Sequence, residues 1–79
     1  MNTNDFNYDD NEYIDILNRL LLILSNKSLL ELIKNDHSKN LINYKLKIEM
    51  INYCIEEYEK TEEYEICAEL LKIKNKIKR

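Results

Sequence analysis

The 79-residue chain contains no glycine and no proline, and this absence limits its fold more than any other feature. Tight hairpins between strands depend on turn residues that accept positive φ, for which glycine is the usual choice. Leu, Ile, Lys and Glu are abundant instead, and most of these residues favour helices. We therefore predict an all-α fold, a small three- or four-helix domain that ends in an antiparallel helical hairpin.

Residues 1–10 are rich in Asn and Asp and show no apolar periodicity, as is typical of a flexible terminal segment. Asp9 or Asp10 can serve as the N-cap of the first helix. We therefore predict a flexible acidic tail over residues 1–10 and a single helical domain over residues 11–79.

The first predicted helix starts near Tyr13 and carries two apolar stripes with 3-4-3 spacing, which predicts burial over most of its circumference. A break follows at Ser25-Asn26, and Ser28 and Glu31 have the spacing of a capping box for a short second helix. One continuous helix is the alternative. The two stripes consist of Ile14, Leu17, Leu21 and Leu24, and of Tyr13, Ile16, Leu20 and Ile23.

The polar segment 35–38 predicts the next turn, because Asn35 can close one helix in the left-handed conformation and Asp36 or Ser38 can cap the next. A third helix follows, with an a/d seam like that of a coiled coil and a second apolar line beside it. The seam consists of Leu41, Tyr44, Ile48, Ile51, Ile55 and Tyr58, and the second line of Leu46, Met50, Tyr53 and Cys54.

Thr61, followed by two glutamates, predicts the N-cap of a fourth helix, so the chain should reverse near Lys60. This helix carries basic residues toward its C-terminus, where cations complement the helix dipole. Its apolar residues at 4-3-4 spacing are Ile66, Leu70, Ile73 and Ile77. The third and fourth helices form the predicted hairpin.

Residues 63–70, Glu-Tyr-Glu-Ile-Cys-Ala-Glu-Leu, resemble the F-E-x-A-A-x-L core of the UVR motif. That motif is a short antiparallel helical hairpin found in nucleotide-excision-repair subunits and in some chaperone adaptors. The matching positions are Tyr64 for the aromatic residue, Cys67 and Ala68 for the small pair, and Leu70 for the aliphatic residue. Residues 71–72, Leu-Lys, stand where the family usually has Arg-Asp. The resemblance covers about residues 46–79 and implies a protein-binding hairpin.

Two cysteines and one histidine are the candidates for thiol or metal chemistry. Cys54 and Cys67 are nearly equidistant from the predicted reversal. We expect two buried free thiols, with a disulfide or a redox switch as the alternative. His37 lies in a polar turn, where we expect a capping or solvent-exposed side chain. This set matches no zinc-finger spacing, so we predict neither a metal nor a cofactor.

The formal net charge of −3 hides an uneven distribution. Six carboxylates surround the predicted reversal, where we expect a solvated face or, alternatively, a contact for a basic partner. They belong to Glu56, Glu57, Glu59, Glu62, Glu63 and Glu65. Residues 72–79 carry five basic side chains, among which Lys72 and Lys76 are candidate partner contacts. Weak binding of nucleic acid there is an alternative.

Aromatic residues complete the set of candidate binding residues. Tyr44, Tyr58 and Tyr64 lie on apolar stripes, so we expect them in the core. Aromatic residues in an acidic tail can form a short motif that orders on a partner, and others fit either a core or an interface. The candidate partner contacts are Phe6 and Tyr8 in the tail and Tyr13 and Tyr53 in the helices.

No catalytic triad, Cys-His pair or Gly-rich phosphate loop can be assembled from this chain, so we do not expect an enzyme. We predict a non-catalytic protein-binding module, a small regulator or inhibitor of a larger protein or ribonucleoprotein. Small size, acidity and an abundance of Asn, Ile, Lys and Tyr, whose codons are AT-rich, resemble those of small phage anti-defence proteins such as anti-CRISPR proteins. The alternatives are a homo-oligomeric assembly protein and a weak nucleic-acid binder.

The apolar stripes are more extensive than so few helices can hide. We therefore predict a homodimer joined through the first helix or through the seam from Leu41 to Tyr58, and a monomer that buries the surplus on its target is the alternative. The longest apolar run, Leu20–Leu24, has five residues and is too short for a membrane span. With no signal-peptide pattern and only two cysteines, we predict a cytoplasmic protein.

Overall fold

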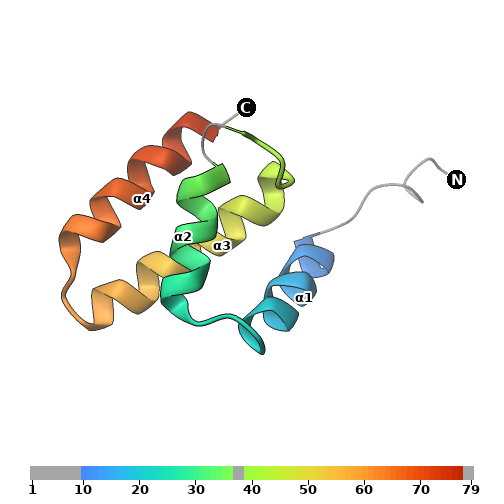
Figure 1. The fold of residues 1–79 in the computed structure, drawn as a ribbon, viewed down its shortest axis with the longest axis horizontal. Helices are drawn as coiled ribbons and strands as arrows, with labels where there is room; N and C mark the ends of the chain where they lie inside the picture. Colours follow the sequence, from blue (N-terminus) through green and yellow to red (C-terminus); the bar gives the residue numbers. More distant parts are fainter. Residues whose placement is uncertain (1–9, 37–38, 78–79) are drawn as a thin grey trace, which may run out of the picture.

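The computed structural model describes residues 10–36 and 39–77, and this part of the chain forms four helices and no strands. They are α1 (Asp10–Leu21), α2 (Asn26–Asp36), α3 (Tyr44–Lys60) and α4 (Tyr64–Ile77). Figure 1 shows that α3 and α4 run antiparallel to each other. The predicted all-α fold with a C-terminal helical hairpin is therefore confirmed.

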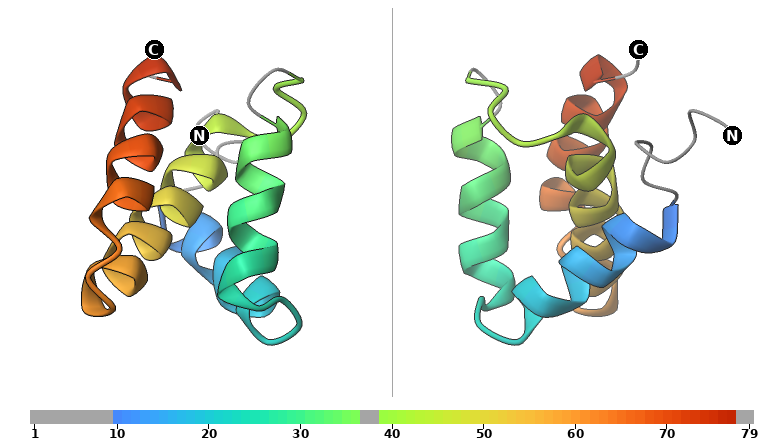
Figure 2. Two further views of the ribbon diagram at one scale, coloured as in Figure 1. Left: turned by 60° about the vertical axis from the view of Figure 1, so that its left-hand side comes forward. Right: turned by 90° about the vertical axis from the view of Figure 1, so that its right-hand side faces the viewer.

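Helix α3 lies at the centre of the fold and is the one helix that packs extensively against each of the other three. Figure 2 shows α4 along one side of α3, with α1 and α2 around its other sides. Side chains from all four helices meet along α3 and form one apolar core. Its buried members are Leu17, Leu29, Leu30, Ile33, Met50, Ile51, Cys54 and Leu70.

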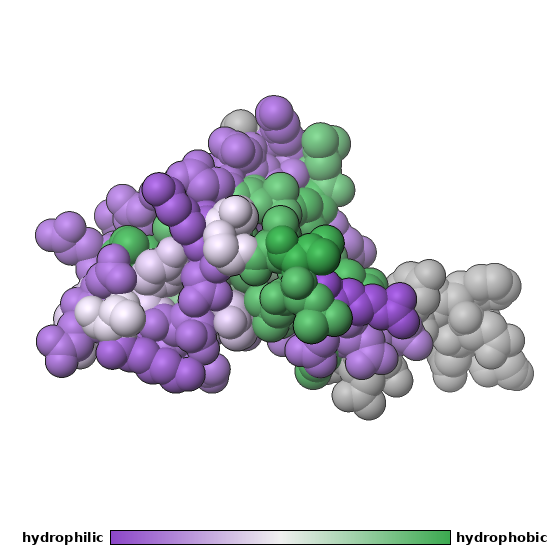
Figure 3. All heavy atoms as spheres, turned by 60° about the horizontal axis from the view of Figure 1, so that its bottom comes forward, coloured by the Kyte–Doolittle hydropathy of each residue, from purple (hydrophilic) through white to green (hydrophobic). Residues whose placement is uncertain are grey.

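Helix α1 buries only one face. Tyr13 and Leu17, one turn apart, are 8% and 6% exposed, whereas Ile14 and Ile16 remain 39% and 38% exposed. The prediction that this helix is buried over most of its circumference is therefore wrong. The physical reason is that, among the described residues, α3 is the only helix that packs extensively against α1. Figure 3 shows apolar side chains gathered at the surface where α1 leads into α2.

The start of α2 lies one turn earlier than the predicted capping box. The Ser25 Oγ accepts a hydrogen bond from the backbone N–H of Ser28 at 3.1 Å, which is the contact an N-cap side chain makes. Ser28 is thus a donor inside the helix and not the cap. The predicted break at Ser25-Asn26 is confirmed, since α2 begins at Asn26.

The reversal between α3 and α4 is closed by a Schellman motif, so Thr61 is the C-cap of α3 and not the predicted N-cap of α4. The backbone N–H of Glu63 donates to the carbonyl oxygen of Tyr58, and that of Glu62 to Glu59, both at 2.9 Å. This pattern requires a left-handed residue, and Glu62 supplies it with a φ of 61°. A non-glycine residue there costs about 1–2 kcal/mol, which the two hydrogen bonds help to offset.

The predicted seam of the third helix fails at its start, whereas Ile51 is buried and Ile55 and Tyr58 pack against the core. Leu41 precedes α3 and is 80% exposed, and Tyr44 is 49% exposed. The expectation of a core position also fails for Tyr64, which is 62% exposed. The line of α3 that is buried consists of Lys47, Met50, Ile51 and Cys54. A lysine therefore occupies a core position that lies outside both predicted apolar lines.

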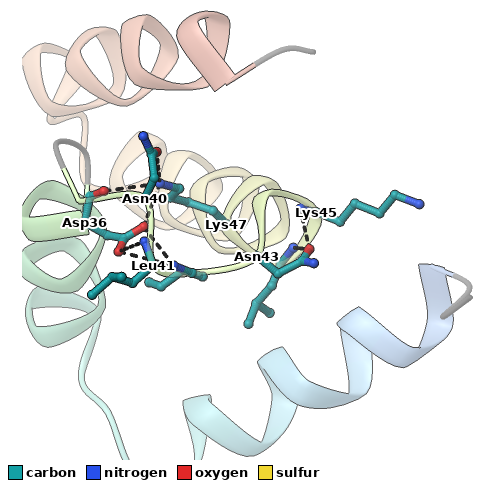
Figure 4. Close-up of polar contacts among 8 residues, drawn as sticks. Asp36, Asn40, Leu41, Asn43, Lys45 and Lys47 are labelled. Atoms are coloured by element: carbon teal, nitrogen blue, oxygen red, sulfur yellow. Dashed lines mark hydrogen bonds and ion pairs between the residues drawn. The ribbon is translucent and has the colours of Figure 1, made fainter. Parts of the chain in front are cut away.

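Lys47 is buried because it forms an ion pair with Asp36 at the end of α2 (Figure 4). The Lys47 Nζ lies 2.7 Å from the Asp36 Oδ2, and the two side chains are 2% and 6% exposed. The Nζ also donates to the Asn40 Oδ1 at 3.3 Å and to the Asp36 carbonyl oxygen at 3.4 Å. An ammonium group has three N–H donors, and each of them finds an acceptor here.

Asp36 binds the connection between α2 and α3 as well as the lysine. Its carboxylate accepts hydrogen bonds from the backbone N–H of Leu41 at 2.7 Å and of Ile42 at 3.1 Å. Burial alone would raise the pKa of Asp36, but the hydrogen bonds from Lys47, Ile42 and Leu41 and the charge of Lys47 outweigh it, so that the pKa is lowered. The carboxylate is therefore held in its ionised form.

The residue that turns the chain after α2 is Asn40, with a φ of 53°, and not Asn35, which lies inside the helix. Its backbone N–H donates to the carbonyl oxygen of Asp36 at 2.8 Å. Asn43 then caps α3, because its Oδ1 accepts from the backbone N–H of Lys45 at 2.8 Å. Asparagine tolerates the left-handed conformation better than most residues, which suits a chain without glycine.

We expect the substitution Lys47→Met to lower the free energy of unfolding by about 3–5 kcal/mol, because it leaves the buried carboxylate of Asp36 without its counter-charge. Urea denaturation monitored by circular dichroism measures this loss. Lys45→Met is the matched control, since Lys45 is an exposed lysine two residues earlier, and it should change stability by less than about 0.5 kcal/mol. Equal effects of the two substitutions would contradict the assigned role of Lys47.

Candidate protein-interaction surfaces

The most exposed apolar side chains occupy the turn between α1 and α2. Leu22 is 85% exposed and Ile23 is 77% exposed, while their neighbours Leu20 and Leu24 are half-buried against the core. We call these four residues the apolar corner. Exposed apolar groups that adjoin one another are characteristic of binding sites, whereas isolated ones are common on any protein surface.

The backbone holds the apolar corner in a defined shape. The N–H groups of Leu22, Ile23 and Leu24 donate to the carbonyl oxygens of Arg19, Leu20 and Leu20 at 3.2, 3.0 and 2.8 Å. These hydrogen bonds form a turn that directly follows the end of α1 at Leu21. Because Leu20 and Leu24 are anchored in the core, Leu22 and Ile23 have to point away from it.

A second surface lies between α3 and α4, on the outer side of the hairpin. It is a hollow of about 670 Å³ with apolar and small side chains from α4 and a polar rim. Leu71 is 49% exposed there and Tyr64 is 62% exposed. We call this hollow the hairpin groove, and it is lined by Asn52, Ile55, Glu56, Glu59, Tyr64, Cys67, Ala68, Leu71 and Lys74.

The six glutamate carboxylates named from the sequence make different contacts and do not form a single patch. Glu56 and Glu59 line the hairpin groove. Glu57 instead pairs with Lys60 at 3.0 Å, and the Glu63 Oε2 lies 2.7 Å from the Thr61 Oγ1. The exposed side chains of Glu62 and Glu65 complete the set near the reversal. The acidic side chains of the hairpin groove therefore lie at the end of the groove that is nearest to the reversal between α3 and α4.

The basic residues of α4 lie at the opposite end of the hairpin. Lys72 and Lys76 are exposed, as a partner contact requires, and they have no ion pair within the described part of the chain. Lys74 is half-buried, and its Nζ donates to the Asn52 Oδ1 at 2.8 Å. This hydrogen bond links α4 to α3.

The candidate aromatic contacts differ in accessibility. Tyr13 is buried at 8% exposure and Tyr53 is half-buried against the core, so neither presents a free ring. Phe6, Tyr8 and His37 lie outside the described residues. Among aromatic residues of the described chain, Tyr44 and Tyr64 are the exposed ones.

Both cysteines are free thiols, as expected, but only Cys54 is buried and Cys67 is half-buried. Burial raises the pKa of Cys54 to about 11, with a further contribution from the charge of Glu57. Burial also raises the pKa of Cys67, assisted by Glu59 and Glu63. The Cys67 Sγ donates to the carbonyl oxygen of Ile55 at 3.5 Å. Since the thiolate is the reactive species, neither cysteine is activated as a nucleophile.

Two further properties concern the residues that the structure describes. Over residues 10–36 and 39–77, no three His, Cys, Asp or Glu side chains come close enough together to hold a metal ion. Within the same residues, no helix has the length and apolar character needed to cross a membrane.

Comparisons with protein-family models, with curated proteins and with solved structures give no match to this chain. The resemblance of residues 63–70 to the UVR motif therefore remains a prediction. A proposal for the function therefore rests on features of this structure itself. These are a four-helix fold, an apolar corner and a hairpin groove with opposite charges at its two ends.

Apolar periodicity predicts correctly that Leu20 and Leu24 pack against the core. It does not reveal the apolar corner, because the same periodicity assigns Ile23 to a buried stripe, and Ile23 is 77% exposed. One signal was available. Five consecutive apolar residues, Leu20–Leu24, cannot all face one side of a helix with 3.6 residues per turn. Some of them must leave the core, and the break after Leu21 determines which ones do.

We expect a small maleimide reagent to modify Cys67 faster than Cys54 in the folded protein, since Cys67 is half-buried and Cys54 is fully buried. Mass spectrometry of Cys54→Ser and Cys67→Ser variants over time separates the two rates. In urea the rates should become equal. Labelling of Cys54 at or above the rate of Cys67 in the native state would contradict this packing.

Proposed function

We propose that this protein is a non-catalytic binding module that acts on a larger protein through its apolar corner. The single observation that carries the proposal is the exposure of Leu22 and Ile23, 85% and 77%, on a turn whose backbone is hydrogen-bonded. Large apolar side chains in this setting fit a pocket on a partner, where they would be desolvated and would contribute most of the binding energy.

The rigidity of the apolar corner favours this role. Leu20 and Leu24 anchor it in the core and its backbone is hydrogen-bonded, so little backbone freedom is lost when Leu22 and Ile23 enter a pocket. Preorganisation of this kind lowers the entropic cost of association. Leu22 and Ile23 also project far into solvent, which suits insertion into the concave site of a partner.

The form of regulation that fits best is inhibition, in which the apolar corner occupies a pocket that the partner needs for its own activity. The small size, the acidity and the many residues with AT-rich codons support a phage-type anti-defence role, with a host nuclease or ribonucleoprotein as target, as in anti-CRISPR proteins. The proposal includes a cytoplasmic location, as predicted from the sequence. The UVR-like hairpin would add a second protein-binding element.

We expect the double substitution Leu22→Ser with Ile23→Ser to abolish stoichiometric capture of a partner from a low-GC bacterial lysate. Loss of two anchor side chains should cost at least about 2 kcal/mol, or about thirtyfold in affinity. The free energy of unfolding should change by less than about 0.5 kcal/mol, because both side chains are exposed. Affinity purification with quantitative mass spectrometry measures the capture.

Leu41→Ser is the matched control for this experiment, since Leu41 is 80% exposed but lies in the connection before α3. It should retain the partner. The activity of the recovered partner should fall when an equimolar amount of the wild-type protein is added. Equal capture by all three proteins, or no stoichiometric partner with the wild type, would contradict the proposal.

A further inference from the structure

The charges of α4 are segregated along its length. Its first half and the reversal before it carry Glu62, Glu63, Glu65 and Glu69, and its second half up to Ile77 carries Lys72, Lys74 and Lys76 without an acid. The side chains of Glu65, Lys72 and Lys76 are exposed and form no ion pair within the described chain. The acidic rim of the hairpin groove, Glu56 and Glu59, lies beside the acidic half.

Between the two charged halves, α4 presents a mixed strip of large and small side chains. Ala68 and Leu71 occupy its middle, and Leu71 is 49% exposed. Both residues line the hairpin groove together with Cys67. Small residues permit close approach of a second helix, and a large residue beside them provides the matching projection.

We propose that the hairpin groove binds α4 of a second copy of this chain, so that two α4 helices run antiparallel about a two-fold axis. The axis passes between Ala68 and Leu71, which sets Leu71 of each copy against Ala68 of the other. A two-fold axis makes each contact occur twice. The surface is thus complementary to itself in shape at its centre.

The same axis makes the surface complementary to itself in charge. Glu65 lies three residues before Ala68, and Lys74 lies three residues after Leu71. With a rise of about 1.5 Å per residue, antiparallel pairing therefore brings the level of Glu65 beside that of Lys74 in the second copy. Lys72 and Lys76 flank this level and are exposed. The acidic half with its groove rim thus meets the basic half of the other copy.

This pairing differs from the homodimer that the sequence suggested, which used the first helix or the seam from Leu41 to Tyr58. It leaves the apolar corner uncovered, since α1 and α4 pack on α3 from different sides. A dimer would therefore present two copies of the apolar corner, which is suited to a partner with two equivalent sites. The inference does not depend on the proposed function.

Charge reversal with mixing tests the proposal. The acid-reversed protein carries Glu59→Lys and Glu65→Lys, and the base-reversed protein carries Lys72→Glu and Lys76→Glu. In each protein alone the facing halves carry like charges, so the dissociation constant of the dimer should rise by about tenfold or more. In an equimolar mixture, every acidic half again faces a basic half, and a heterodimer of near wild-type affinity should form.

Sedimentation velocity up to millimolar concentration gives the masses, and native mass spectrometry identifies the mixed dimer. The control carries Asp15→Lys and Glu31→Lys, the same change in net charge at exposed positions of α1 and α2, and should dimerise like the wild type. The wild-type dimer should weaken as salt is added. The heterodimer also shows that both reversed proteins are folded.

Three results would overturn the proposal. The first is a wild-type protein that stays monomeric up to millimolar concentration, which would leave the hairpin groove to a different occupant such as a basic amphipathic helix. The second is a dimer that is indifferent to both reversals, which would place the interface on another face. The third is a mixture of the reversed proteins that stays monomeric.

Discussion

The buried ion pair between Lys47 and Asp36 is the interaction on which the arrangement of the helices depends. It joins the end of α2 to the first turns of α3, and the same carboxylate binds the backbone of the connection at Leu41 and Ile42. A chain without glycine has few ways to turn sharply, so a side chain has to hold this connection in place. For a domain of this size, the total free energy of unfolding is about 5–10 kcal/mol. The loss of one such buried pair, about 3–5 kcal/mol, is therefore a large part of what keeps the protein folded.

The position of α3 determines which surfaces stay open. Because α3 alone contacts the other three helices extensively, each outer helix buries one face and leaves another in solvent. On α1 this leaves Ile14 and Ile16 partly exposed and lets the chain leave the core at Leu22 and Ile23. On the hairpin it leaves the groove with Tyr64 and Leu71. Both candidate binding surfaces are thus consequences of a small core that has a single central helix.

Periodicity predicts the existence of the helices well and their buried faces less well. The line from Ile66 to Ile77 has one regular spacing and one neighbouring helix, and its residues are buried or half-buried as expected. The seam from Leu41 to Tyr58 fails at its start, because hydropathy alone cannot reveal that Lys47 has a carboxylate partner eleven residues earlier. Ser25 caps α2 in place of the expected Ser28, and Asn43 caps α3 in place of the expected Asp36 or Ser38, since capping depends on where packing ends each helix. Of the predicted contacts, Glu56 and Glu59 line a groove and Lys72 and Lys76 are exposed, whereas Tyr13 is in the core.

The ionisation of Asp36 links the ion pair to pH. Its pKa is lowered from the ordinary value of 3.8, so its contribution to stability is complete at neutral pH and is lost as the pH falls through the lowered value. The most direct test of this ion pair is a pH titration of the Asp36 side-chain carboxyl carbon, followed by ¹³C NMR in the folded protein. We expect a pKa below 3.8 in the folded wild type, a higher pKa in the folded Lys47→Met variant, and the ordinary value when the wild type is unfolded in urea. A pKa at or above 3.8 in the folded wild type would show that Lys47 does not hold the carboxylate in its ionised form, and would contradict the central role of this ion pair.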